Sequence, residues 1–378
     1  MNRRTFLKIT GGGVVVAATG IGGFVATRTP GAALAPWDRA GRYADPRMNA
    51  LSFAILAPNP HNRQPWEVRL DGEDGLTLFF DTDKQLPHTD PFDRQLTIGL
   101  GCFLEMLRMA ASADGYELDI ALFPEGEDAA GLDRRPIAKV VFEQSAADVD
   151  PLFAHVPERR SNKEPFDASR DVPADALARI LTVARQTQLG GSVAADDVSY
   201  WRDLTTKALE IEIETPHTYK ESVDLMRIGK AEVNANPDGI DFSGPLFETL
   251  ALAGVMTREA LMDTTSTGYI EGVKAVTANT NTAMGHLWMV TGGNSRRDQI
   301  AAGADWLRVN LACTREGLGF QPLSQALQEY PEMAELYAET HGKLAPSGGT
   351  VQMLSRIGYG PSVAVSPRWP VEAKIRTL

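Results

Sequence analysis

The sequence predicts an α+β protein of about two domain-sized units, and three observations support this fold class. The chain has 378 residues, of which 43% are hydrophobic and 23% charged, which is the balance of an ordinary globular protein. Apolar residues recur at helical spacing in some segments and alternate as in strands in others. One helical segment is echoed further along the chain, as a duplicated fold would leave it.

Local patterns predict the elements in chain order. A helix over 48–57 is stopped by two prolines, and a hairpin follows with strands at 67–72 and 76–80. The remaining expected elements are a long helix at 94–113, a strand at 137–143, a helix at 173–186 opened by Asp171 and an N1-type proline, helical signals over 280–316 and a short strand at 363–365.

The internal echo lies in two helical segments that are offset by 202 residues. The first runs from Gly101 to Gly115 and the second from Gly303 to Gly317. Each opens on Gly-x-x-Leu or Gly-x-x-Trp and ends on an acid followed by glycine. A helix common to two halves is the expected trace of a duplicated fold, so the echo favours two related halves.

Composition excludes some classes of function. A net charge of -12 argues against nucleic acid, because phosphate backbones are bound by clustered Lys and Arg. Cys102 and Cys313 each lie in an apolar helical run, where a cysteine usually acts as a small buried hydrophobe. The alternative is a disulfide between the two cysteines in an oxidising compartment. The two cysteines and six histidines show no metal-ligand spacing, so no metal is predicted.

The N-terminus is typical of an export signal, which we assign to residues 1–35. Arg3-Arg4 with Phe6-Leu-Lys8 resembles a twin-arginine signal, and an uncharged apolar run over 9–26 and a small-residue stretch over 31–35 follow. The alternative is a short N-terminal membrane helix. Ala33-Leu-Ala35 offers a cleavage site, but the run is also just long enough for an uncut anchor in the inner membrane.

This address carries information about function. The twin-arginine export machinery moves folded proteins, so the signal favours a protein that acquires a tightly held cofactor before export to the periplasm. Residues 1–35 hold four basic residues and no acid, so their removal changes the net charge from -12 to -16.

Pro58-Asn-Pro-His-Asn-Arg-Gln-Pro-Trp66 is the densest motif of the body. Its prolines fix an extended loop, and Asn59, Asn62 and Gln64 supply amide donors and acceptors. The alternative is a proline-rich turn from helix to strand, which explains the prolines but not the amides.

A second motif reads Glu158-Arg-Arg-Ser-Asn-Lys163. Arg159, Ser161 and Lys163 stand two apart and therefore face the same way on an extended segment. Arginine, hydroxyl and lysine on one face suit a phosphate and an electron-rich ring edge. The alternative is a solvated basic turn.

Together the two motifs resemble the FMN-dependent nitroreductase family, whose hallmarks are an Arg-x-Ser-x-Arg/Lys opening and a Pro-Ser-x-x-Asn-x-Gln-Pro-Trp loop. Further matches lie at 317–325, 356–360 and 366–368, so the resemblance spans about residues 48 to 370. It implies the nitroreductase-like α+β fold. Asn59 departs from the usual serine of the loop.

Motif order is the second departure. The basic opening usually precedes the loop in each chain of the family, whereas here the loop comes first and residues 186–195 take its place in the second part. The chain therefore resembles the twin-arginine-exported, fused-dimer (Acg-like) branch, with two pseudo-symmetric halves at 36–155 and 156–378 that mimic the family homodimer in a monomer.

The resemblance assigns roles to particular residues. Arg159, Ser161 and Arg368 would hold the FMN phosphate, and Lys163 would face the N1/O2 edge of the flavin. The loop would close over the ribityl chain and ring, and the backbone of Ser324 and Gln325 would meet flavin N5. The full set of expected cofactor-binding residues is Pro58, Asn59, Asn62, Gln64, Arg159, Arg160, Ser161, Asn162, Lys163, Ser324, Gln325 and Arg368.

The resemblance implies two-electron transfer through FMN to a nitro, quinone or related small acceptor. No GxGxxG motif follows a strand and no GxSxG motif is present, which argues against a Rossmann nicotinamide domain and a serine hydrolase. The electron donor is either NAD(P)H or a membrane or protein donor, and the sequence does not decide between them. The alternative is an FMN-sequestering protein, for which Tyr219, Arg227 and Asp238-Gly239 in an insertion at 215–266 would form a lid, unless the insertion lies away from the site. A third possibility is a membrane-tethered redox partner, if the signal stays uncut.

Overall fold

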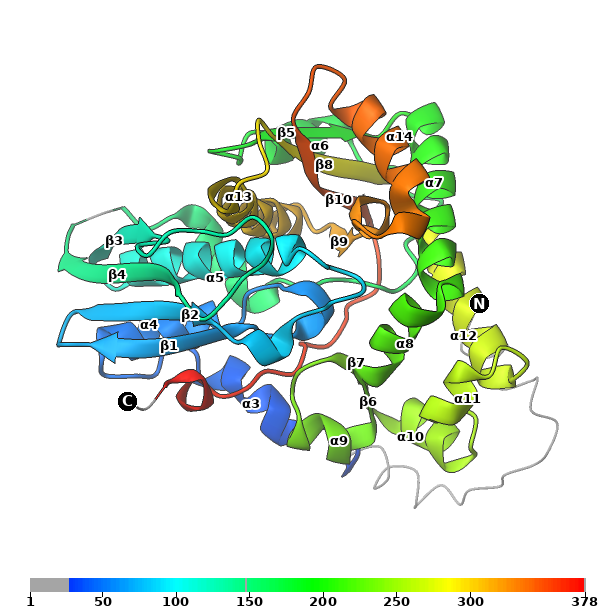
Figure 1. Ribbon diagram of the computed structural model, residues 1–378, viewed down its shortest axis with the longest axis horizontal. Helices are drawn as coiled ribbons and strands as arrows, with labels where there is room; N and C mark the ends of the chain where they lie inside the picture. The colour runs from blue at the N-terminus through cyan, green and yellow to red at the C-terminus, as the bar shows by residue number, and fades with distance from the viewer. Residues whose placement is uncertain (1–26, 147, 377–378) are drawn as a thin grey trace.

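The computed structural model describes residues 27–146 and 148–376, and it contains two antiparallel four-stranded sheets with a pair of long helices between them (Figure 1). The predicted leader lies outside the described residues up to position 26. Helices α3 (Gly31–Arg39) and α4 (Pro46–Ala54) precede the first sheet. Asp45 begins α4 as its N-cap, because its side chain accepts a hydrogen bond from the Arg47 amide.

The first sheet has the order β1-β2-β4-β3. Its strands are β1 (Trp66–Asp71), β2 (Gly75–Phe80), β3 (Tyr116–Leu122) and β4 (Pro136–Gln144). β1 and β2 form the predicted hairpin, with Trp66 opposite Phe80. Between β2 and β3 runs α5 (Arg94–Ala113), whose bounds are those predicted.

The second sheet has the order β5-β8-β10-β9. Its strands are β5 (Gln188–Ser192), β8 (Gly285–Thr291), β9 (Gly319–Pro322) and β10 (Thr350–Gly358). Between β8 and β9 runs α13 (Arg296–Arg315), which a capping box at Ser295 begins. The two sheets therefore have the same topology. When the strands of each sheet are numbered 1 to 4 along the chain, both have the spatial order 1-2-4-3, and in both a long helix follows strand 2.

The two long helices cross where the sequence echo places a glycine in each. A Cβ on Gly101 would collide with the Ile300 carbonyl and lie 2.9 Å from the Gly303 Cα. A Cβ on Gly303 would likewise collide with the Ile98 carbonyl. The Cys102 thiol donates to the Gly303 carbonyl at 3.1 Å. Only glycine at both positions lets the backbones approach this closely.

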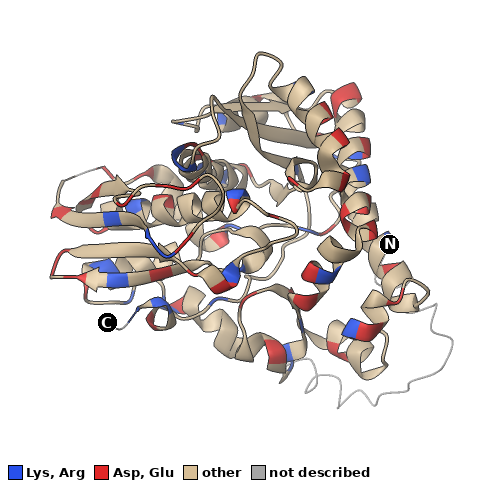
Figure 2. Cartoon of the chain, viewed as in Figure 1, with Lys and Arg blue, Asp and Glu red and all other residues tan. Residues whose placement is uncertain are grey.

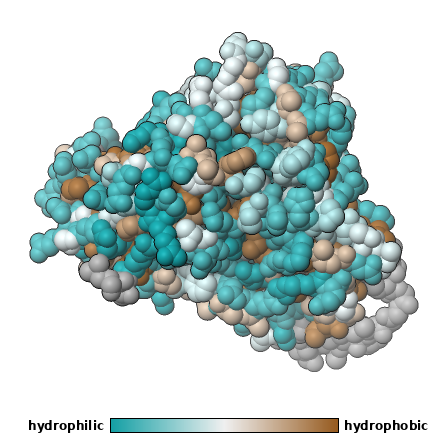
Figure 3. Space-filling model, in the orientation of Figure 1, coloured by the Kyte–Doolittle hydropathy of each residue, from teal (hydrophilic) through white to brown (hydrophobic). Residues whose placement is uncertain are grey.

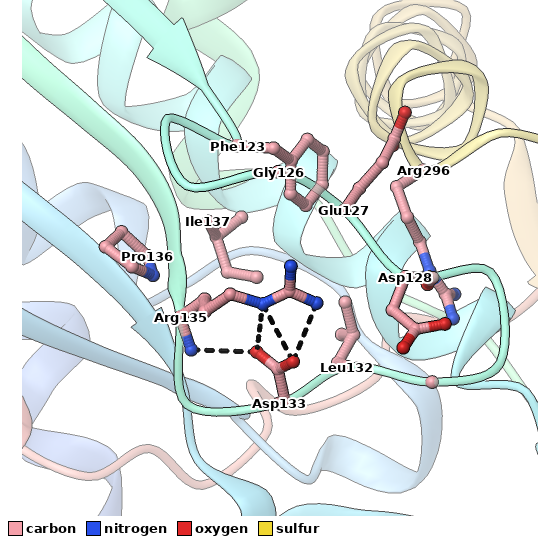
Figure 4. Close-up of a pocket in the computed structure, with 11 residues that line it drawn as sticks. Phe123, Gly126, Glu127, Asp128, Leu132, Asp133, Arg135, Pro136, Ile137 and Arg296 are labelled. Atoms are coloured by element: carbon pink, nitrogen blue, oxygen red, sulfur yellow. Dashed lines mark hydrogen bonds and ion pairs between the residues drawn. The ribbon is translucent and has the colours of Figure 1, made fainter.

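An arginine at the start of each long helix binds across the seam between the two sheets. Arg94 donates to the Gln352 and Leu327 carbonyls at 2.8 and 2.6 Å. Arg296 donates to the Asp128 carbonyl at 2.9 Å, in the loop between β3 and β4 (Figure 4). Both arginines are buried and are separated by the same 202 residues as the glycines.

Helix α5 is the centre of the core. It is long and apolar enough to cross a membrane, but most of it is buried inside the protein. Cys102 and Cys313 are buried and free, as expected of small hydrophobes, and no disulfide joins them. Burial raises the pKa of the Cys102 thiol to about 12, so this thiol is unreactive at neutral pH.

The remaining helices flank the second sheet or form the insertion. Near the sheet lie α6 (Ala174–Leu181), α7 (Ala195–Glu214) and α14 (Ala334–Leu344). The insertion at 215–266 contains α8 (Pro216–Asp224), β6 (Met226–Ile228), α9 (Gly229–Ala235), β7 (Ile240–Phe242), α10 (Pro245–Leu252) and α11 (Arg258–Met262), and α12 (Thr267–Thr280) follows it. It has a small apolar cluster of its own around Val223, Met256 and Leu261.

Acidic residues recur along α7 and the insertion helices (Figure 2), and the face shown in Figure 3 is mainly hydrophilic.

Three local predictions were wrong. The helix expected at 173–186 ends at Leu181, and Pro173 is its N-cap rather than its first residue. The helical signals over 280–316 include strand β8, which is buried on both faces and so lacks the alternation of a half-exposed strand. Residues 363–365 form no strand, whereas 350–358 do. The long helix α5 and the hairpin were predicted correctly because their patterns are long or bounded by turns.

Candidate functional site

Two buried arginines from distant parts of the chain meet at the end of α4. Arg159 and Arg368 are each 2% exposed, and both donate to the Leu56 carbonyl, at 3.0 and 3.1 Å. Arg368 also donates to the Ala57 carbonyl at 3.1 Å. The Nε atoms of both arginines are buried without a partner. Within the described parts of the chain, neither guanidinium forms an ion pair with a carboxylate.

The charge of this pair is not compensated. Burial lowers the pKa of Arg159 to about 10. Burial, and then the charge of Arg159, hold the pKa of Arg368 well below its ordinary value. Desolvated like charges disfavour each other, so an anion between them would relieve both costs.

The 58–64 loop is held in an unusual backbone conformation next to this pair. His61, Asn62 and Gln64 have φ of 46°, 52° and 50°, in the left-handed region. The Asn59 side chain accepts from the Gln64 amide at 2.7 Å, and the Asn62 side chain accepts from Arg368. The amides predicted from the motif therefore fix the loop and tie it to the basic pair.

The C-terminal segment closes the loop from the other side. Gln64 accepts from the Trp369 amide at 2.9 Å through its side chain, and its carbonyl accepts from Lys374 Nζ at 2.8 Å. This segment returns from the second sheet to the first, where the Arg376 amide donates to the Val68 carbonyl at 2.7 Å (Figure 1).

Lys163 lies close to the loop. Its side chain is solvent-accessible, yet surrounding protein atoms lower the pKa of its ammonium through desolvation. Burial, followed by the charge of Lys163, lowers the pKa of His61 to about 4. Lys163 thus faces the loop with its charge unpaired by a near carboxylate, while Asp241 and Glu212 act on it from a greater distance. Ser161 is exposed beside it.

The other two residues of the opening bind the protein itself. Asn162 does not point its polar groups at the basic pair. Its backbone amide donates to the Phe320 carbonyl at 2.8 Å, and its side chain donates to the Pro361 carbonyl at 2.9 Å. The Arg160 guanidinium carbon lies 5.2 Å from the centre of the Trp37 ring, and the group donates to the Val363 carbonyl. These contacts place Arg159 and Lys163 rather than extend the basic surface.

Ser324 and Gln325 reach the same region through α5. Ser324 donates to the Gln95 side chain at 3.1 Å. One helical turn later, the Asn59 side chain lies against Gly99, with its Cβ 3.0 Å from where a glycine substituent would be. Gln325 Oε1 is buried without a partner. The 58–64 loop and the Ser324–Gln325 segment therefore contact α5 at positions about one helical turn apart, at Gly99 and Gln95.

The insertion covers the outside of the loop. The Pro237 carbonyl accepts from Gln64 Nε2 at 2.6 Å, and the Gly239 amide donates to the Asn62 carbonyl at 3.2 Å. Asp238, which is 4% exposed, forms ion pairs with Lys84 and Arg227 at 2.5 and 3.0 Å.

Of the residues expected at a lid, Arg227, Asp238 and Gly239 thus lie at the loop. Tyr219 instead donates to the Leu261 carbonyl within the insertion.

Comparisons with known proteins show what the chain is similar to. No family model matches the chain. A "Putative NAD(P)H nitroreductase" of Mycobacterium tuberculosis strain H37Rv is 28% identical over 317 residues, covering 82% of this chain and 84% of that protein. "Putative NAD(P)H nitroreductase acg" of the same organism is 34% identical over 122 residues, or 31% of this chain and 35% of that protein. The chain is thus similar, at 28–34% identity, to putative NAD(P)H nitroreductases.

A solved structure of a putative nitroreductase from Anabaena variabilis matches 81% of this chain and 82% of its own, at 10% identity and a TM-score of 0.41.

The donors at the basic pair fit the phosphate of FMN. In the described parts of the chain, the two guanidiniums have orphaned Nε atoms and no carboxylate partner. A phosphate would supply an acceptor for Nε and the negative charge beside the amide-rich loop. Sequence reasoning missed the contributions of Trp37, Lys374 and the Leu56 carbonyl. No local sequence pattern marks them, because Trp37 contributes by packing against the arginines, Lys374 by a buried hydrogen bond to Gln64, and Leu56 through its main-chain carbonyl.

Two hollows elsewhere in the protein are distinct from this site. The hollow around Arg296, Asp133 and Arg135 (Figure 4) has a volume of about 10 Å³, room for one water at most. A larger cleft of about 400 Å³ lies between α8 and the loop that follows β2, and it is lined by Gln85, Leu86, Pro87, His88, His217, Lys220, Glu221, Asp224 and Leu225.

Proposed function

We propose that the protein is an FMN-binding oxidoreductase that transfers two electrons to a nitro, quinone or related small acceptor. The observation that carries this proposal is the pair Arg159 and Arg368, two buried cations that share one carbonyl and have no carboxylate partner among residues 27–146 and 148–376. Bound FMN would supply the redox chemistry, and its phosphate would neutralise the pair. Each charged hydrogen bond to the phosphate would contribute roughly 1.5–3 kcal/mol.

The chain's own residues would bind and orient the cofactor. Arg159, Ser161 and Arg368 would hold the phosphate, and the loop amides would cover the ribityl chain. Lys163 would place a positive charge at the N1/O2 edge of the ring, where reduction adds negative charge. The Ser324–Gln325 backbone would lie at N5. The insertion would exclude water from the loop side through Pro237 and Asp238.

The tandem sheets support a fused dimer with one FMN site. Val183 corresponds to Leu56, because each is the first residue after the C-cap of the helix before its sheet. The Val183 carbonyl accepts from Arg308 Nε at 2.9 Å. Arg308, however, forms ion pairs with Asp150 and Glu105 at 2.6 and 3.1 Å, both buried. At Val183, carboxylates of the chain itself therefore neutralise the arginine that binds the carbonyl. At Leu56, no carboxylate of the described residues neutralises Arg159 or Arg368.

The loop of the second half is filled in the same manner. Asp305 is fully buried and accepts from the backbone amides of Arg185, Gln186 and Thr187 at 2.8 to 2.9 Å. Successive amides that converge on one point form an anion-binding site, and here a carboxylate of α13 already occupies it. The asymmetry supports one FMN per chain.

We also propose export by the twin-arginine route, on the basis of the sequence of residues 1–35. The described part of that segment includes Ala33 in α3, whose amide donates to Asn234 at 3.1 Å and whose carbonyl accepts from the Arg368 amide at 2.8 Å. These bonds favour a mature chain that retains Ala33, whether anchored in the inner membrane or cut upstream. In the periplasm the donor would be a membrane or protein donor, or NAD(P)H if it reaches the site.

A second candidate function is FMN sequestration with little turnover. The contact of Asp238 and Pro237 with the loop favours it, since a closed insertion limits access to the flavin. Anaerobic reduction of the purified holoprotein by NADH, NADPH and dithionite in turn tests both functions. Rapid bleaching by a nicotinamide supports the oxidoreductase, and bleaching by dithionite alone supports sequestration or a dedicated donor. A protein that binds no FMN contradicts both.

A further inference from the structure

A buried acid lies behind the candidate site with few partners. Glu212, near the end of α7, is 7% exposed, and one of its oxygens accepts from Gln328 Nε2 at 2.8 Å. No lysine or arginine in the described ranges forms an ion pair with it. Its charge acts on Lys163, so the acid and the ammonium belong to the same region. Gln328 directly follows η4 (Gln325–Leu327), the turn that would meet flavin N5.

Buried polar groups gather around this acid. Hydrogen bonds from Gln328 and Ser222 lower the pKa of its carboxyl, and the charge of Glu212 raises the pKa of Tyr330, whose phenol also interacts with Thr218. Gln328, Tyr330 and Ser222 are each at most 8% exposed, and in the described parts of the chain Gln328 Oε1 is buried without a hydrogen-bond partner. A buried polar cluster of this kind has the groups that can hold an ordered water or pass a proton.

A chain of side chains leads from this cluster to solvent. The Tyr330 ring lies edge-on to His217, with centroids 6.1 Å apart, and His217 lies edge-on to His88 at 5.1 Å. Both histidines line the 400 Å³ cleft beside α8. Glu221 fixes the cleft wall by accepting from the His88 and Thr89 amides at 3.0 Å each.

We propose that Glu212 is the acid that supplies the proton consumed at the candidate site, and that the proton is replaced from the His88–His217 cleft through Tyr330. The proposal rests on the proposed oxidoreductase function. Two-electron reduction of a quinone or nitro group needs a hydride, which comes with the flavin, and one proton. The O–H bond of Glu212 breaks as an O–H bond forms on the acceptor. The carboxylate left behind is then reprotonated from water.

The surroundings of Glu212 favour its neutral, proton-carrying form. Burial raises the pKa of its carboxyl to about 7, and the charge of Glu221 on α8 adds to the rise. The Gln328 hydrogen bond and the charge of Lys163 lower the pKa but do not cancel the desolvation. Burial and the charge of Glu212 also raise the pKa of Tyr330, so the phenol stays protonated.

Infrared spectroscopy of Glu212→Gln tests the first step, with Glu214→Gln on the exposed end of the same helix as control. We expect a buried carboxylic-acid carbonyl band that disappears as pH rises through about 7 in wild type and Glu214→Gln and is absent from Glu212→Gln. A wild-type spectrum without this band, or a band that survives Glu212→Gln, overturns the proposal. Because the apoprotein serves for this measurement, the result is independent of whether FMN binds.

Stopped-flow reoxidation of the reduced holoprotein by a quinone tests the second step. Glu212→Gln should slow reoxidation by about 10²- to 10⁴-fold at unchanged FMN occupancy, the usual contribution of a general acid. His217→Phe should slow it less and recover with added imidazole. Unchanged rates in Glu212→Gln refute the proton role while leaving the oxidoreductase function intact. Wild type that retains no FMN refutes the oxidoreductase function instead.

Discussion

Arg159 and Arg368 donate hydrogen bonds to one carbonyl oxygen, that of Leu56, at 3.0 and 3.1 Å. Their guanidiniums are therefore close neighbours in a buried environment, and the charge of Arg159 further lowers the pKa of Arg368. Such a pair is unfavourable in isolation and favourable around a doubly charged phosphate.

Replacing either arginine by alanine should weaken FMN binding. The loss of a charged hydrogen bond worth roughly 1.5–3 kcal/mol corresponds to about 10- to 150-fold in Kd for each variant. Fluorescence titration of the apoprotein with FMN measures the effect. Arg179→Ala is the control, because Arg179 forms exposed ion pairs with Asp175 and Glu316. Unchanged affinity in the double variant Arg159→Ala/Arg368→Ala rejects this phosphate site.

One chain should suffice for one FMN. A loop variant (Asn62→Ala, Gln64→Ala) and an opening variant (Arg159→Ala, Lys163→Ala) each damage a different part of the same site. A mixture of the two should bind FMN no better than either alone, far below one FMN per two chains, as absorbance and light scattering would show. Recovery of wild-type affinity at about one FMN per two chains would mean that the site is shared between chains.

Gly101→Ala and Gly303→Ala should both destabilise the protein. A Cβ at either position meets the backbone of the facing helix, which cannot move as a flexible side chain can. The expected loss is about 1–3 kcal/mol or more in the free energy of unfolding, measured in urea. Gly342→Ala is the control: it lies in α14 with nothing within 4 Å, so alanine there should stabilise by about 0.5–1 kcal/mol. Equal effects at all three positions would contradict the close crossing.

Asp238→Ala should release the insertion from the loop. It leaves Lys84, Arg227 and Arg63, 3.9 Å away, clustered without their shared acid, and breaking such a buried pair costs about 3–5 kcal/mol locally. We expect faster FMN dissociation and faster proteolysis within 215–266. Asp224→Ala, which removes only the exposed pair with Lys220, should change neither. A wild-type dissociation rate in Asp238→Ala would show that the insertion does not retain the cofactor.

Replacement of Arg3 and Arg4 by lysine should leave the protein in the cytoplasm, still able to bind FMN. The paired arginines are the feature that distinguishes a twin-arginine signal from a general one. Cell fractionation with an antibody, together with the flavin absorbance of the cytoplasmic pool, measures both outcomes. Export of the lysine variant at the wild-type level would assign the signal to the general pathway.

Several features were readable from the sequence because they are local. The periodicity of α5, the turn between β1 and β2 and the glycine echo all lie within short windows, and the structure has each of them. The amides of the 58–66 loop were also visible in the sequence as a set, since the bonds between them span only a few residues, and their role at a cofactor stays a prediction. Where local patterns misled, as at β8, burial on both faces had removed the alternation that marks a strand.

The pairing of Arg159 with Arg368 depended on the tertiary structure. The sequence by itself determined that a basic opening, an amide-rich loop and a C-terminal Ser-Pro-Arg exist in this chain. Only folding decided that Arg159 and Arg368 converge on Leu56 with Asn62 of the loop bound to Arg368, that Arg308 is neutralised by Asp150 and Glu105, and that Glu212 is buried beside Gln328. The reason is physical: which charges are desolvated and which find a counter-ion depends on contacts between residues far apart in the chain, and no local pattern encodes those contacts.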